Sequence, residues 1–132
     1  MFKELNTFTS QGNLGEARAI YELTKLGYVV SKPLNVNNKY DFVVDDGKSL
    51  HKVSVKTSYN KTKSGGYEVA IRTSGGNSSK NNIKLRLQGD FDMLFVMLDN
   101  DDCYLIPESH LGDVKNSIVV GNKYKEFLLG KP

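Results

Sequence analysis

The chain has 132 residues, a hydrophobic fraction of 39% and a formal net charge of +3 at pH 7. This length supports one hydrophobic core, so we expect a single domain over residues 1–132, with its core at about 10–106. The apolar run at 93–98 is too short to cross a bilayer, the first residues lack a secretory signal pattern, and the single Cys103 excludes an intramolecular disulfide. We therefore expect a cytoplasmic protein with no membrane partner.

The first expected element is an amphipathic helix that follows the capping residues at 9–13 and ends at Gly27. Its apolar positions recur at helical spacing and should face the core: Ala17, Ile20 and Leu23. The charged residues on the opposite face should be exposed: Arg18, Glu22 and Lys25. Glu16 shares the face of Ile20 and Leu23, so the spacing directs its carboxylate toward the rest of the fold.

A short extended segment at 28–30 comes next and ends near Pro33. Residues 40–44 and 51–56 then predict a hairpin around the turn at 45–48. In its second strand Val53 and Val55 point to one face, so Ser54 and Lys56 point to the other.

Further strands are predicted at 67–73, 91–98 and 103–106, the last two as a buried hairpin. Polar, basic loops separate the earlier strands at 58–66 and 74–82, and a short helix can start at 107. The tail at 107–132 has apolar residues at helical spacing and could pack on the domain or on a second subunit: Tyr124, Phe127 and Leu128. These elements predict an α/β or α+β fold with the first helix packed on the sheet.

Charge is unevenly distributed along the chain. Residues 48–86 contain nine Lys or Arg and one acid, Glu68, whereas residues 87–113 contain seven acids and no Lys or Arg. A basic half is suited to a polyanion, although runs of solvated charge also occur on ordinary surfaces.

Two charges interrupt the apolar strands of the first hairpin. Asp41 opens one strand and Lys56 ends the next. A lone buried charge costs several kcal/mol unless a partner or a metal compensates it, and Glu16 adds a third charge on the packing side of the helix. The alternative is a structural one, in which Asp41 and Lys56 form a cross-strand ion pair and Glu16 is an exposed first-turn acid favoured by the helix dipole.

The acid on the helix, the acid opening the hairpin and the lysine ending the next strand resemble the PD-(D/E)XK nuclease superfamily. The resemblance covers residues 10–106 and is greatest to small intron-encoded homing endonucleases, and more distant to archaeal Holliday-junction resolvases. It rests on the segments GEARAIYELTKLGY, YDFVV, VSVKTS, DFDMLFVML and CYLIP. It implies a restriction-endonuclease-like core, with a mixed central sheet flanked by helices.

The resemblance also implies a catalytic set, which falls here on Glu16, Asp41, Ser54 and Lys56. Mg²⁺ would be held by Asp41, the backbone carbonyl of Val55 and Glu16, since this ion prefers oxygen ligands. Lys56 would orient or deprotonate the attacking water and offset charge in the transition state. Ser54 departs from the family pattern, which has Asp, Glu or Gln there, so metal affinity is weaker, a water bridges the gap, another acid such as Glu68 compensates, or activity has been lost.

The expected activity is Mg²⁺-dependent hydrolysis of double-stranded DNA, of the site-specific homing type, by an intracellular, nucleoid-associated enzyme. A long target needs more surface than this chain offers, so a homo-oligomer, a dimer or tetramer, is expected. Basic residues of the two loops and their flanks are the candidates for contacting DNA: Lys61, Lys63, Arg72, Lys80, Lys84 and Arg86.

Other functions remain open at this point. A junction resolvase would use the same chemistry on a four-way DNA, and a decayed module would bind DNA without cutting it. A scaffold without nucleic acid is the remaining alternative. His51 and His110 lack the neighbours of a zinc site and are expected at the surface or in turns, and Cys103 is expected to be a buried small hydrophobe. The paired glycines lack the context of a phosphate-binding loop, so no nucleotide cofactor is expected.

Overall fold

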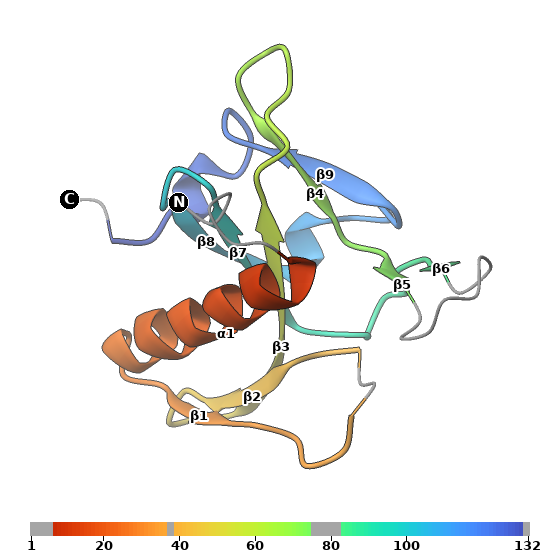
Figure 1. The fold of residues 1–132 in the computed structure, drawn as a ribbon. Helices are drawn as coiled ribbons and strands as arrows, with labels where there is room; N and C mark the ends of the chain where they lie inside the picture. The colour runs from red at the N-terminus through yellow and green to blue at the C-terminus, as the bar shows by residue number, and fades with distance from the viewer. Residues whose placement is uncertain (1–6, 37–38, 75–82, 131–132) are drawn as a thin grey trace.

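The computed structural model describes residues 7–36, 39–74 and 83–130 and is built around a five-stranded mixed sheet (Figure 1). In sheet order, its strands are β1 (Val29–Ser31), β2 (Phe42–Asp45), β3 (Leu50–Ser58), β7 (Met93–Leu98) and β8 (Cys103–Pro107). β3 and β7 are parallel, and the other neighbours are antiparallel. The expected hairpins β2–β3 and β7–β8 are therefore confirmed, and the mixed α+β fold class with them.

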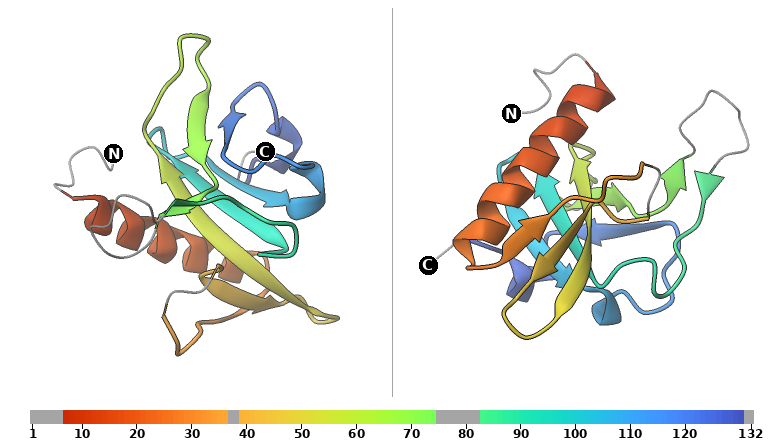
Figure 2. Two further views of the ribbon diagram at one scale, coloured as in Figure 1. Left: turned by 90° about the vertical axis from the view of Figure 1, so that its right-hand side faces the viewer. Right: turned by 90° about the horizontal axis from the view of Figure 1, so that it is seen from below.

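The helix α1 (Phe8–Lys25) covers one face of this sheet (Figure 2). Thr7 caps its first turn by accepting a hydrogen bond from the amide of Ser10. Beneath it lies a cluster of buried residues from the helix and four strands: Ala19, Leu23, Phe42, Val44, Val53, Phe95, Met97 and Cys103. Burial of Cys103 agrees with its expected role as a small hydrophobe.

The buried stripe of α1 is rotated from the one that the sequence predicts. The residues facing the sheet are Gln11, Gly15, Ala19, Glu22 and Leu23. Ala17 is exposed and Ile20 is 44% exposed, so both expected core positions were wrong. Small residues line the contact because the helix approaches β3 closely: a Cβ on Gly15 would lie 2.4 Å from Cγ2 of Thr57.

Glu22, expected in solvent, is buried instead. Its carboxylate accepts a 2.9 Å hydrogen bond from Nε of Arg18 and lies 3.7 Å from Nζ of Lys25. Two cations on the same helix thus compensate the desolvated acid, as burial of a carboxylate requires.

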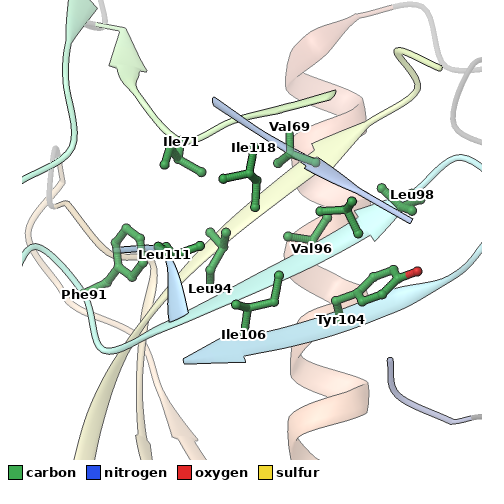
Figure 3. Packing of buried hydrophobic residues seen from close by; sticks show 11 residues of the cluster. Val69, Ile71, Phe91, Leu94, Val96, Leu98, Tyr104, Ile106, Leu111 and Ile118 are labelled. Carbon is green, nitrogen blue, oxygen red and sulfur yellow. The ribbon is translucent and has the colours of Figure 1, made fainter. Parts of the chain in front are cut away.

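The other face of the sheet is covered by a two-stranded antiparallel sheet of β4 (Tyr67–Ala70) and β9 (Ser117–Val120). Figure 3 shows side chains of β7 and β8 packed against Val69, Ile71 and Ile118 in this second cluster. The predicted strand at 67–73 is interrupted after Ala70, and Thr73–Ser74 forms β5, which pairs with β6 (Ile83–Lys84).

The tail folds back onto the domain. It contains the single-turn 3₁₀ helices η2 (Glu108–His110) and η3 (Lys125–Phe127), and the apolar side chains of Tyr124, Phe127 and Leu128 pack against the second cluster. The amide of Leu129 also donates a 2.8 Å hydrogen bond to the Cys103 carbonyl. No helix in the described ranges has the length and apolar character needed to span a bilayer.

Candidate active site

Asp41 stands where the β2–β3 ladder ends, at the Phe42–Val53 pair. Its amide donates a 2.8 Å hydrogen bond to the carbonyl of Val53, and its Oδ2 accepts a 2.7 Å hydrogen bond from the amide of Val55. Burial raises the pKa of the Asp41 carboxyl, and the Val55 hydrogen bond partly opposes that rise. The carboxylate is thus both desolvated and held at a defined position.

Glu16 approaches Asp41 from α1. The negative charge of Glu16 adds to the rise in the Asp41 pKa, so the two carboxylates are close enough to repel. Oε1 of Glu16 accepts a 2.9 Å hydrogen bond from Nζ of Lys32, and Glu16 is only about a third exposed, at 32% of its side chain. The Glu16 side chain is therefore partly buried and lines the edge of both pockets.

Lys32 is the residue of this site that the sequence did not indicate. Its hydrogen bond with Glu16 raises the pKa of the ammonium group, and the charge of Asp41 adds to that rise. In the antiparallel β1–β2 ladder, Ser31 pairs with Val43. The following pair of positions is Lys32 and Phe42, so Lys32 lies near Phe42 and its neighbour Asp41. Only the strand pairing, which a single sequence does not reveal, could have identified it.

Lys56 lies on β3 directly after Val55, and its Nζ donates a 3.3 Å hydrogen bond to the carbonyl of Arg72. Burial lowers the pKa of Lys56. Asp41 opposes that shift, and the nearby Arg72 guanidinium adds to it. An amine with a lowered pKa beside a carboxylate is the arrangement expected of a group that orients or accepts a proton.

A pocket of about 440 Å³ opens beside these residues. It is lined by Phe8, Gly12, Glu16, Val55, Lys56, Thr57, Ala70 and Arg72. A second pocket of about 190 Å³ is lined by Glu16, Lys32, Tyr40 and Asp41 among others. Glu16 lines both pockets, so the pocket of Lys56 and the pocket of Asp41 adjoin at this residue.

Ser54 lies beside Val55 on β3 but is not part of either pocket lining. It is 4% exposed and pairs in register with Leu94 of β7. Glu68, the acid considered as its replacement, is exposed on β4 and also lines neither pocket. The structure therefore brings Glu16, Asp41, Val55 and Lys56 together but does not place Ser54 or Glu68 on the cavity.

The donor set fits a hard divalent cation. Two mutually repelling carboxylates and a neighbouring backbone carbonyl are what Mg²⁺ uses when it keeps several of its waters. The described residues contain no group of three or more His, Cys, Asp or Glu placed to hold a metal ion, so water would complete the coordination. His51 bonds to Asp46 in the β2–β3 turn, and His110 stacks edge-on against Phe127, in agreement with their expected structural positions.

The predicted DNA-contacting residues fall in three places. Lys61 and Lys63 are exposed on the loop between β3 and β4, which extends well beyond the sheet (Figure 1). Lys84 is exposed on β6, Arg72 lines the larger pocket, and Lys80 lies outside the described residues.

Arg86 must be removed from that set. Its side chain is 1% exposed, its Nε and Nη2 donate to the carbonyls of Val114 and Gly112 at 2.8 and 2.7 Å, and its Nη1 is paired with Glu108. The Arg86 guanidinium therefore stabilises the segment around η2, and it is too buried to contact a DNA phosphate.

Comparisons with known proteins agree with this geometry. A family model described as PD-(D/E)XK endonuclease matches residues 7–126. The chain is 32% identical over 118 residues to Protein 5.3 of Escherichia phage T7, covering 89% of this chain and 94% of that protein. It is also similar to the solved structure of a bacterial homing endonuclease, I-Ssp6803I, with a TM-score of 0.74 and 27% identity over 96% of this chain and 85% of the other. The chain belongs to the PD-(D/E)XK endonuclease family.

Proposed function

We propose that this protein is a Mg²⁺-dependent endonuclease that cuts double-stranded DNA at a specific site, as a homing-type enzyme. The observation that carries the proposal is the placement of Glu16 between two adjoining pockets, one lined by Lys56 and the other by Asp41, with Asp41 held by the Val55 amide. The similarity to a homing endonuclease supports the finer assignment.

Asp41 and Glu16, with the Val55 carbonyl, are the residues that would hold the ion. When bound, Mg²⁺ would polarise the phosphoryl oxygens and neutralise charge that develops on them. The charge of Glu16 contributes to the raised pKa of Asp41, and a bound cation would offset the charges of both carboxylates.

Lys56 would position the attacking water. In hydrolysis the water oxygen bonds to phosphorus, one phosphorus–oxygen ester bond breaks, and the leaving oxygen takes up a proton. The lowered pKa of Lys56 raises the fraction of neutral amine, which can accept a proton from the water, while its charged form can stabilise the phosphoryl oxygens.

Double-stranded DNA as substrate is supported by the basic loop between β3 and β4, which carries the exposed Lys61 and Lys63. Neutralising backbone phosphates releases counterions and favours binding of a polyanion. We include a homo-oligomer in the proposal, because cutting both strands at one site requires two active sites.

Cleavage of a randomised DNA library and a supercoiled plasmid, with the new ends sequenced, tests this proposal. Wild-type protein should cut with Mg²⁺, and Asp41→Asn and Lys56→Gln should not. Asp113→Asn and Lys125→Gln are matched controls, since both residues are exposed and line neither pocket of the site. Equal cutting by wild type and Asp41→Asn would contradict the proposal, as would cutting that continues in EDTA.

Ser54 supports a second candidate, a DNA-binding module that has lost cleavage. Its buried hydroxyl replaces the acid or amide of the family pattern and lies off the pocket. This candidate predicts salt-sensitive DNA binding that is unchanged by EDTA, with no cleavage by wild type. Gain of Mg²⁺-dependent cutting in Ser54→Asp would then identify the missing ligand.

A further inference from the structure

Arg72 brings a second cation to the pocket of Lys56. Both side chains line the 440 Å³ pocket, and Nζ of Lys56 donates to the Arg72 carbonyl at 3.3 Å. The two positive charges therefore share one pocket. Two like charges in a partly buried pocket repel, and this arrangement is stable only if something compensates it.

No carboxylate in the described residues compensates Arg72. The described ion pairs do not include it, and Glu16, the acid of this pocket, is paired with Lys32 at 2.9 Å. The Arg72 side chain has one described hydrogen bond, from Nη1 to Oδ1 of Asn116 at 3.1 Å. A guanidinium has five N–H donors, so the remaining donors of the fork are available to an anion.

Asn116, just before β9, holds Arg72 in three ways. Its carbonyl accepts hydrogen bonds from the amides of Ile71 and Arg72 at 2.9 and 3.2 Å, and its side chain accepts from the guanidinium. Ile71 is 2% exposed and packs in the second cluster, so this connection is anchored in the core. The arginine is therefore oriented before any ligand arrives, which avoids an ordering cost at the moment of binding.

We propose that Arg72 and Lys56 together bind the phosphodiester group that is cut, with Arg72 contacting its non-bridging oxygens and Asn116 as the positioning residue. A planar guanidinium matches a phosphate through two parallel hydrogen bonds, and these strengthen as negative charge grows on the oxygens. This assignment rests on the proposed nuclease function. The role of Arg72 thus differs from that of Lys61 and Lys63, which would contact DNA phosphates away from the bond that is cut.

Single-turnover cleavage rates and duplex affinity measured in Ca²⁺ distinguish these roles. Arg72→Gln should lower the rate constant about 100-fold, with a much smaller change in affinity. Arg72→Lys should have a rate constant about tenfold higher than that of Arg72→Gln, because lysine restores the positive charge but not the two parallel hydrogen bonds of a guanidinium. Lys61→Gln should do the reverse, weakening duplex affinity while leaving the rate constant of the bound complex unchanged. An Arg72→Gln enzyme with the wild-type rate constant would overturn the proposal.

The positioning role of Asn116 is tested by a double-mutant cycle. Asn116→Ala should lower the rate about tenfold, and the loss should vanish when Arg72 is already Gln, because the residue acts through the guanidinium. Thermal unfolding of each variant controls for a folding defect. Fully additive losses would overturn this part of the inference.

The anion-binding role of Arg72 can also be tested without DNA cleavage. If wild type cuts no DNA, titration calorimetry with sodium phosphate still tests the anion pocket. Phosphate binding weakened at least tenfold by Arg72→Gln, but not by Lys125→Gln, would support it. Equal binding by wild type and Arg72→Gln, or no binding, would overturn it.

Discussion

The amide of Val55 donates a 2.7 Å hydrogen bond to Oδ2 of Asp41 across the end of the β2–β3 ladder. The carboxylate thus takes the place of a backbone acceptor at the point where the two strands separate. Because Lys56 follows Val55 directly, the spacing between the acid and the lysine is set by the strand itself. The backbone of β3 therefore fixes the position of the Asp41 carboxylate, and the helix adds Glu16 to the candidate site.

Asp41→Asn should abolish cleavage and raise stability at neutral pH. Burial raises the folded pKa of Asp41 above its ordinary value of 3.8, so the folded state binds more protons than the unfolded state just above that pH. The stability from this group is fully present below pH 3.8 and is lost as the pH rises through the folded pKa. Urea unfolding in EDTA at several pH values should show that the free energy of unfolding of wild type decreases relative to that of Asp41→Asn as the pH rises. A difference between the two proteins that does not change with pH would contradict this prediction.

Gly15→Ala should destabilise the fold by about 2 kcal/mol, because the added methyl overlaps the Thr57 side chain and forces the helix away from β3. The contact would be 2.4 Å. Gly12→Ala on the same helix is the matched control, since a Cβ there meets nothing within 4 Å. It should stabilise by about 0.5–1 kcal/mol through helix propensity. Chemical denaturation measures the stability of both variants. Equal effects of Gly15→Ala and Gly12→Ala would contradict the close approach of the helix to β3.

Lys32→Gln should tighten binding of divalent cations by roughly threefold at low salt, because it removes the ammonium that competes for Glu16. Lys32 lies 2.9 Å from Oε1 of Glu16. Calcium titration calorimetry measures the change, which should shrink as ionic strength rises. Lys48→Gln, in the exposed β2–β3 turn, is the control and should leave the affinity unaltered. Weaker binding in Lys32→Gln would mean that Lys32 helps to assemble the site.

Glu108→Gln should destabilise the protein by about 3 kcal/mol, since it leaves the buried Arg86 guanidinium without its counter-charge. Arg86 is 1% exposed, and its other bonds are to backbone carbonyls. DNA affinity of the folded variant should be unchanged. Lys84→Gln, exposed on β6, should show the opposite pattern, with stability retained and DNA binding weakened. A stable Glu108 variant with weak DNA binding would restore Arg86 as a DNA contact.

The sequence alone determined the five strands of the central sheet, the fold class and three of the charged residues of the candidate site, but it did not indicate β6 or β9. Alternation in β3 and the apolar runs of β7 and β8 are local patterns, and Glu16, Asp41 and Lys56 stand out because charges are costly within such patterns. The resemblance to nucleases then supplied the chemistry that links them.

Only the tertiary structure decided which cations lie at the candidate site and which hold the fold. Lys32 reaches Glu16 through the β1–β2 register, and Arg72 reaches the pocket of Lys56 because Asn116, 44 residues later, holds it. Arg86, in the same basic stretch of sequence, is instead buried against η2. These outcomes depend on contacts between distant segments. A basic residue carries the same charge in the sequence whether it faces DNA, an acid or the core, so the packing assigns its role.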